Sequence, residues 1–87
     1  MAEIKVYTKN GCPQCDMTKR VLEQEGLEYK LVNIDDKEED GATYTKDAQE
    51  ARDYIINDLG FMAMPVVVAE GHEPFSGFRP DKLMALK

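Results

Sequence analysis

The chain has 87 residues, of which 43% are apolar and 32% are charged, and this balance is typical of one small globular domain, here residues 1–87. No run reaches the roughly 18 apolar residues that a membrane-spanning helix needs. The first residues lack a basic start followed by an apolar run, so we expect no secretory signal. The sequence therefore predicts a cytoplasmic protein without a membrane partner.

The net charge of −6 is concentrated in the middle of the chain. Residues 35–58 hold nine acidic and three basic side chains, whereas residues 1–34 and 59–87 are each balanced. Nucleic-acid binding requires a basic face, so we exclude a nucleic-acid partner. The acidic stretch Asp35–Asp47 is predicted to be largely solvated, and we assign no function to it.

A strand, a helix and a second strand are predicted in the first 34 residues. Polar and apolar residues alternate over 3–7, which indicates a strand. After a turn, Pro13 suits the start of a helix that runs to Glu25, and Gly26 suits its end. A second strand follows over 28–34. The three elements together predict a right-handed βαβ unit with parallel strands.

An exposed loop and a second helix are predicted after this unit. The segment from Asp35 to Thr45 is acidic and shows no period, so we expect a loop. A helical pattern resumes over 46–59 and ends at Gly60. Asp47 and Glu50 stand at the spacing of a capping box at the start of that helix.

The last third of the chain predicts two strands and a helix. A continuous apolar run over 66–69 is typical of a strand buried on both faces, a short strand follows around 74–76, and Pro80 begins the last helix. The order β-α-β-α-β-β-α predicts an α/β protein of thioredoxin-like fold, with a four-stranded mixed sheet flanked by three helices. Five apolar residues are expected in its core: Met17, Val21, Ile55, Leu59 and Leu83.

Two cysteines, Cys12 and Cys15, are the only thiols. A disulfide that closes so short a loop would restrict little of the unfolded chain, so a purely structural bridge is not expected. A structural zinc or iron–sulfur site needs four ligands, and the chain offers two thiols and the distant His72, which is predicted to face solvent. A C-x-x-C motif at a strand–helix junction instead predicts a redox-active dithiol/disulfide pair.

The two thiols are predicted to have different roles. Cys12 lies at the start of the helix, where unpaired N–H groups and the helix dipole stabilise a thiolate, and Lys9 lies three residues upstream. Cys15 lies about one turn into the helix and can donate its S–H to that thiolate. We therefore expect Cys12 to be the exposed nucleophile and Cys15 the shielded resolving thiol.

A second feature expected near the dithiol is Pro65, at the start of the third strand. We predict a cis Met64–Pro65 bond that leaves the backbone of Met64 free to pair with an incoming chain. Phe61, Met62 and Met64 precede this strand. They are expected to form an apolar docking surface beside the dithiol.

Three segments carry a resemblance to a known family. The chain resembles glutaredoxins, and in particular the NrdH-redoxin family, over residues 3–34 and 54–87. The segments that carry the resemblance are Cys12-Pro13-Gln14-Cys15, Met64-Pro65 and Ser76-Gly77-Phe78-Arg79-Pro80. The resemblance implies that thioredoxin reductase and NADPH reduce the Cys12–Cys15 disulfide, and that the dithiol then reduces the large subunit of class Ib ribonucleotide reductase.

The resemblance also implies roles for individual residues. It places Phe78 and Arg79 where the last helix is tied to the sheet, so that Arg79 gives structural support. No bound cofactor is expected beyond the redox-active disulfide, and the protein is expected to be a monomer. Partner contacts are expected from Lys9, Pro13, Gln14, Met64, Pro65, Gly77 and Phe78.

Two other functions remain open at this point. A glutathione-dependent glutaredoxin would use the same dithiol, but such proteins typically carry a Gly-Gly pair and an Asp where this chain has Gly77-Phe78-Arg79. An iron–sulfur module would use Cys12 to ligate a cluster shared between two chains. Coupled assays with thioredoxin reductase or glutathione separate the first two functions, and visible absorbance of anaerobically purified protein tests the third.

Overall fold

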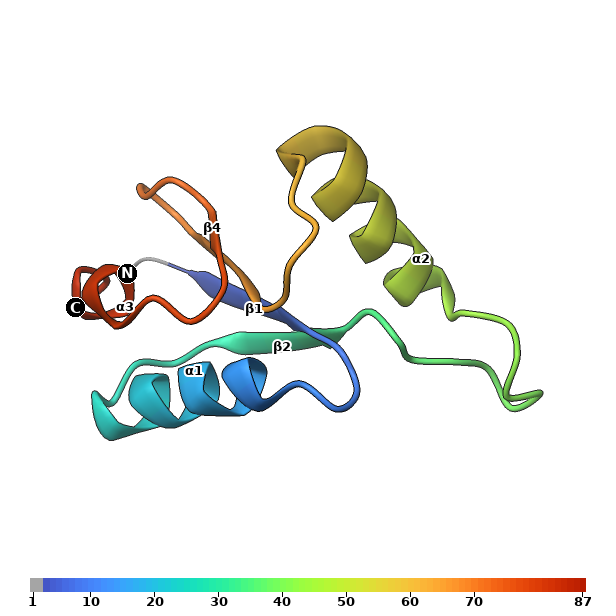
Figure 1. The fold of residues 1–87 in the computed structure, drawn as a ribbon, viewed down its shortest axis with the longest axis horizontal. Coiled ribbons are helices and arrows are strands. Elements are labelled where there is room, and N and C mark those ends of the chain that lie inside the picture. The colour runs from blue at the N-terminus through green and yellow to red at the C-terminus, as the bar shows by residue number, and fades with distance from the viewer. Residues whose placement is uncertain (1–2) are drawn as a thin grey trace.

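The structure, a computed structural model, describes residues 3–87 and contains a four-stranded mixed sheet (Figure 1). The strand order is β2-β1-β3-β4; β1 pairs parallel with β2 and antiparallel with β3, and β3 pairs antiparallel with β4. The strands are β1 (Ile4–Thr8), β2 (Lys30–Asn33), β3 (Val66–Ala69) and β4 (Phe75–Ser76). The helices are α1 (Pro13–Gln24), α2 (Lys46–Asp53), its π-helical continuation η1 (Tyr54–Leu59) and α3 (Pro80–Met84). The element order and the mixed sheet agree with the prediction.

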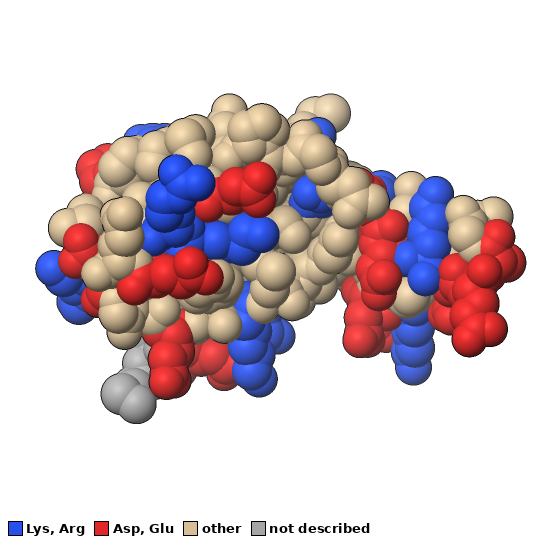
Figure 2. All heavy atoms as spheres, turned by 90° about the horizontal axis from the view of Figure 1, so that it is seen from below, with Lys and Arg blue, Asp and Glu red and all other residues tan. Residues whose placement is uncertain are grey.

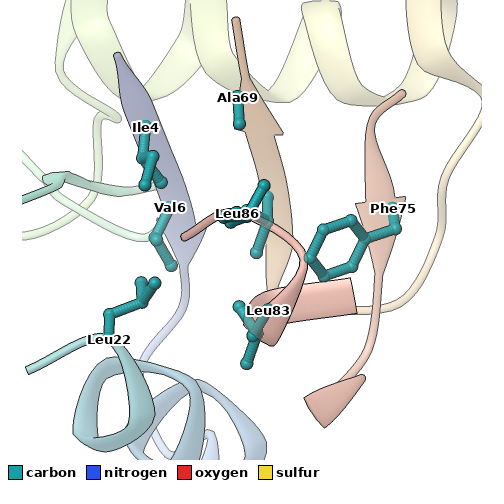
Figure 3. Close-up of a cluster of buried hydrophobic side chains, with 8 residues drawn as sticks. Ile4, Val6, Leu22, Ala69, Phe75, Leu83 and Leu86 are labelled. Carbon is teal, nitrogen blue, oxygen red and sulfur yellow. The ribbon is translucent and has the colours of Figure 1, made fainter. Parts of the chain in front are cut away.

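The two faces of the sheet bury different helices, because successive side chains of a strand point to opposite faces. Ile4 and Val6 of β1 join Leu22 of α1 and Leu83 of α3 in one core cluster (Figure 3). Tyr7 of β1 points the other way and packs in a second cluster. That cluster contains Tyr7, Ile34, Ala51, Ile55 and Val66. The sheet is therefore covered by α1 and α3 on one face and by α2 with η1 on the other.

The buried stripe of α1 differs from the predicted one. Met17 was expected in the core but is 39% exposed, and the buried residues of the helix are Cys15, Thr18 and Leu22. Thr18 can be buried because its hydroxyl donates a hydrogen bond to the backbone carbonyl of Gln14, at 2.9 Å. The face of α1 that meets the sheet is therefore the face that carries Cys15.

The second strand is shorter and more exposed than predicted. It spans Lys30–Asn33 rather than 28–34, and Leu31 is 49% exposed. The reason is its position at the edge of the sheet, where β1 is its one neighbour among the strands of residues 3–87.

Residues 35–45, here called the acidic arm, project from the body of the molecule between β2 and α2 (Figure 1). An isolated antiparallel bridge joins Lys37 to Tyr44. At its tip, the Asp40 carboxylate accepts hydrogen bonds from the N–H groups of Ala42 and Thr43 and from the Thr43 hydroxyl. These bonds lower the pKa of Asp40 to about 2. The arm is exposed, as expected, and its tip is organised by local bonds.

The second helix begins with a different cap from the predicted one. Thr45 is the N-cap, and its side-chain oxygen accepts a hydrogen bond from the N–H of Ala48 at 3.2 Å. The predicted capping box of Asp47 and Glu50 is therefore wrong by two positions. η1 ends at Gly60, as predicted, where a φ of 73° favours glycine. Within residues 3–87, no helix has the length and apolar character needed to cross a membrane.

Candidate active site

Cys12 is placed by the turn between β1 and α1. Gly11 has a φ of +64°, a conformation that glycine adopts without strain, and it reverses the chain ahead of the helix. Cys12 is then the N-cap of α1 and Pro13 occupies the first turn, as predicted. The Cys12 sulfur accepts a hydrogen bond from the N–H of Cys15 at 3.2 Å. A donor of the helix N-terminus is therefore aimed at the sulfur, where it stabilises negative charge.

The two cysteines are joined by a disulfide. Cys12 is 8% exposed and Cys15 is 2% exposed. Cys12 was expected to be exposed, and in this disulfide-bonded form it is buried, although it is the more accessible of the two. An external thiol that attacks this disulfide can therefore reach the Cys12 sulfur more easily than the Cys15 sulfur.

Pro65 precedes β3 and follows a cis Met64–Pro65 bond, as predicted. The carbonyl of Pro65 accepts a hydrogen bond from the N–H of Gly77 at 2.8 Å. Among residues 3–87, the backbone groups of Met64 have no backbone hydrogen-bond partner. They are therefore available to an extended chain laid beside them.

Gln14, between the two cysteines, contacts the segment after β4. Its side-chain oxygen accepts a hydrogen bond from the N–H of Phe78 at 3.0 Å. Gly77 has a φ of +80°, and a Cβ added there would lie 3.7 Å from the same Gln14 oxygen. Since the Gly77 N–H also bonds Pro65, the structure links the C-x-x-C motif, the cis-proline segment and the turn after β4 through consecutive bonds.

Phe78 and Arg79 differ in how they meet the rest of the fold. The Phe78 side chain is half-buried and packs against the core cluster shared by the sheet, α1 and α3. The Arg79 side chain is exposed, and its one ion pair among the described residues is with Asp81, at 3.8 Å. Packing between the last helix and the sheet in this segment therefore involves Phe78, whereas the Arg79 guanidinium pairs with Asp81 in the first turn of α3.

Phe61, Met62 and Met64 line one groove, together with Lys9 and Ile56. Its volume is about 650 Å³. Met62 is 97% exposed and Ile56 is 58% exposed, whereas Phe61 and Met64 also pack against the core cluster under η1. The residues expected to form an apolar surface thus lie together, and Lys9 is at the same groove.

A polar network beside the dithiol was not anticipated from the sequence. The Asp35 carboxylate accepts a hydrogen bond from the N–H of Asn10, at 3.0 Å, and forms an ion pair with Arg52. These residues lie 25 and 17 positions from Asp35 in the chain, so no local sequence signal could have paired them.

His72 is exposed as predicted, and within residues 3–87 no three His, Cys, Asp or Glu side chains are grouped to hold a metal ion.

Sequence comparisons identify relatives along most of the chain. A family model described as Glutaredoxin matches residues 4–73. The glutaredoxin-like protein NrdH of Salmonella typhimurium is 39% identical over 83 residues, which cover 95% of this chain and 86% of that protein. NrdH of Lactococcus lactis is 34% identical and the match covers 95% of this chain and 97% of that protein.

Solved structures give the same result for the fold. The glutaredoxin-like NrdH-redoxin of Escherichia coli, described as having a thioredoxin-like activity profile, matches with a TM-score of 0.77 and 34% identity over 98% of this chain and 95% of its own. A glutaredoxin from Archaeoglobus fulgidus matches with a TM-score of 0.76 and 28% identity over 99% of this chain and 86% of its own. These similarities confirm the predicted thioredoxin-like fold.

Proposed function

Because the chain belongs to the glutaredoxin family of thiol–disulfide oxidoreductases, and within it to the NrdH type, we propose that it carries electrons from thioredoxin reductase and NADPH to class Ib ribonucleotide reductase. The observation that supports this most is the Cys12–Cys15 pair at the N-terminus of α1. The thioredoxin-like activity profile of the similar Escherichia coli protein supports thioredoxin reductase as the electron source. The protein would act as a single cytoplasmic domain and as a monomer.

The proposed reaction consists of two exchanges at sulfur. The Cys12 thiolate attacks a disulfide of ribonucleotide reductase, forms a mixed disulfide and releases one partner thiolate, which takes up a proton. Cys15 then loses its proton and attacks the Cys12 sulfur, which releases the second partner thiolate. The partner gains two electrons and the protein is left with the Cys12–Cys15 disulfide. Thioredoxin reductase returns two electrons from NADPH to that disulfide.

The partner segment would bind along the cis-proline side of the dithiol. The unpaired backbone groups of Met64 would pair with the partner's extended chain, and the groove with Met62 would take an apolar side chain. Six residues would form the contact surface around the two sulfurs: Lys9, Pro13, Gln14, Met64, Gly77 and Phe78. Pro65 is itself buried, so it would contribute by shaping the segment that presents the Met64 backbone.

Glutathione is the competing reductant. A glutathione carboxylate is bound through free N–H donors or cationic side chains. In this chain the Phe78 N–H already donates to Gln14, and the Gly77 N–H donates to Pro65. Both bonds would have to break before these groups could hold a carboxylate. This favours thioredoxin reductase over glutathione as the reductant of the protein.

Two coupled assays test the proposal. The oxidised protein is mixed with NADPH and thioredoxin reductase, or with NADPH, glutathione and glutathione reductase, and NADPH consumption is followed. We expect rapid consumption in the first assay only, and the reduced protein should then support turnover by a class Ib ribonucleotide reductase. Rapid consumption in the glutathione assay alone would contradict the proposal and identify a glutathione-dependent glutaredoxin.

A further inference from the structure

The turn that presents Cys12 is held from outside the C-x-x-C motif. Asn10 lies two residues before Cys12, and its N–H donates to the Asp35 carboxylate at 3.0 Å. The Asn10 side-chain oxygen accepts a second bond from the side-chain amide of Asn33, also at 3.0 Å. Both bonds fix the turn to the end of β2 and the first residue of the acidic arm. The turn between β1 and α1 is thus held in place by residues that lie outside α1.

Arg52 of α2 holds Asp35 in the position that this turn requires. Its Nε–H donates to the carbonyl of Ile34 at 2.7 Å, and its terminal nitrogen pairs with the second oxygen of the Asp35 carboxylate. The two side chains are only 27% and 26% exposed, so water screens the pair less than an ordinary surface pair. A guanidinium can make both bonds at once because its donors form a rigid, planar fork.

The acidic arm reaches the same arginine. The Tyr44 ring lies under the Arg52 guanidinium, with 4.0 Å from the guanidinium carbon to the ring centre. The in-plane N–H groups of the guanidinium donate to Ile34 and Asp35, whereas the Tyr44 ring covers one of its faces, so the ring limits the remaining freedom of the Arg52 side chain. A continuous chain of contacts therefore runs from Tyr44 through Arg52 and Asp35 to Asn10.

We propose that Asp35 and Arg52 are positioning residues for Cys12, and that Tyr44 couples the acidic arm to them. This inference rests on the proposed role of Cys12 as the attacking thiol. When the chain of contacts is intact, the turn holds Cys12 at the N-cap of α1, where the helix N–H groups stabilise its thiolate. When Arg52 is lost, the Asp35 carboxylate loses its partner, the turn loosens and the thiolate is less well stabilised.

The test measures the reactivity of Cys12 directly. Reduced protein is alkylated with iodoacetamide at a fixed pH, and fragmentation of the tryptic peptide of residues 10–19 locates the adduct. The variants are Arg52→Ala, Asp35→Ala and the double variant. Arg20→Ala is the matched control, because Arg20 is an exposed arginine with no ion pair among residues 3–87. Thermal unfolding of each variant reports folding separately from reactivity.

We expect Arg52→Ala and Asp35→Ala each to slow alkylation of Cys12 by about fivefold, and the double variant to be no slower, because residues in one network are not additive. The reduction potential of Arg52→Ala should move to a more negative value, since the reduced form loses thiolate stabilisation. Arg52→Lys keeps the charge without the fork and should give an intermediate rate. If Arg52→Ala is unfolded, the Cys12 alkylation rate of Arg52→Lys tests the positioning role instead.

Tyr44 is tested by two substitutions in the same assay. Tyr44→Phe keeps the ring and should alkylate at the rate of the original protein, whereas Tyr44→Ala should be slower. Equal rates for Tyr44→Ala and Tyr44→Phe would overturn the coupling to the arm. Rates for folded Arg52 variants that equal the Arg20→Ala rate would overturn the positioning role. If iodoacetamide modifies Cys15 before Cys12 in the original protein, the proposed role of Cys12 fails instead.

Discussion

The side-chain oxygen of Gln14 accepts a hydrogen bond from the backbone N–H of Phe78, 64 residues further along the chain. Gln14 is the second residue between the cysteines, and Phe78 lies in the turn that leads from β4 to α3. The bond therefore joins the first turn of the redox helix to the C-terminal part of the fold. It gives the glutamine a structural task in addition to any contact with a partner.

Replacement of this glutamine should lower stability by a small, measurable amount. Gln14→Leu removes the acceptor and leaves the Phe78 N–H to solvent, so we expect the free energy of unfolding to fall by about 0.5–1.5 kcal/mol. Urea unfolding measures the change. Gln24→Leu, at the exposed end of α1, is the matched control and should lower the free energy of unfolding by less. Equal losses in the two variants would show that the Gln14–Phe78 bond contributes nothing net.

Serine substitutions should separate the roles of the two cysteines. Cys12→Ser removes the proposed nucleophile and should abolish disulfide reduction in the coupled assay. Cys15→Ser keeps the nucleophile but removes the thiol that releases the partner, so a covalent mixed disulfide should accumulate. Non-reducing electrophoresis with the partner checks both outcomes. Accumulation of the mixed disulfide in Cys12→Ser instead would reverse the assignment.

A charge placed at Met62, in the groove that Phe61 and Met64 also line, should slow reduction by thioredoxin reductase. Met62 is almost fully exposed, so Met62→Lys should leave the fold intact while it disfavours an apolar partner side chain. We expect kcat/KM with the reductase to fall by about fivefold or more, as for residues that carry binding energy at an interface. Met84→Lys adds the same charge on α3, at a methionine that is 44% exposed, and should have little effect. An unchanged kcat/KM for Met62→Lys would exclude Met62 from the docking surface.

Met64→Lys should slow the same reaction. Met64 also packs against the core cluster under η1, so the stability of this variant must be measured alongside its kcat/KM.

The tip of the acidic arm should titrate at unusually low pH. The pKa of Asp40 is lowered to about 2 by the Thr43 hydroxyl and by two backbone N–H groups. A depressed pKa in the folded state stabilises the arm above the ordinary value of 3.8, and this contribution is lost as the pH falls through about 2. Thr43→Val should raise the Asp40 pKa towards 3.8, whereas Thr43→Ser should keep it low. Carboxyl carbon shifts in an NMR titration give both values, and identical titrations of the two variants would contradict the prediction.

Local sequence patterns predicted most of the fold because the elements carry their own signals. Pro13 and Gly26 bounded the first helix, and the valine run marked the central strand β3. Exposure was harder to predict, since it depends on how elements pack. Leu31 is apolar but lies on an edge strand, and Met17 lies on the outer side of a helix whose buried stripe includes Thr18.

In the candidate site, too, local motifs could be located from the sequence, whereas contacts between distant segments could not. The two cysteines and the cis proline could be located from short motifs. The contacts of Gln14 with Phe78 and of Arg52 with Asp35 could not, because they join segments that only the tertiary fold brings together.

The uneven distribution of charge also has a consequence for motion in solution. The entire excess of negative charge lies in residues 35–58, and Figure 2 shows acidic side chains crowded on the projecting lobe. The molecule is therefore an electric dipole with its negative pole displaced from the nearly neutral body. Such a dipole rotates in the field of a charged protein before the two surfaces touch, and dissolved salt weakens the torque. The orientation in which this protein meets a partner is thus biased at a distance, before any sulfur comes within reach.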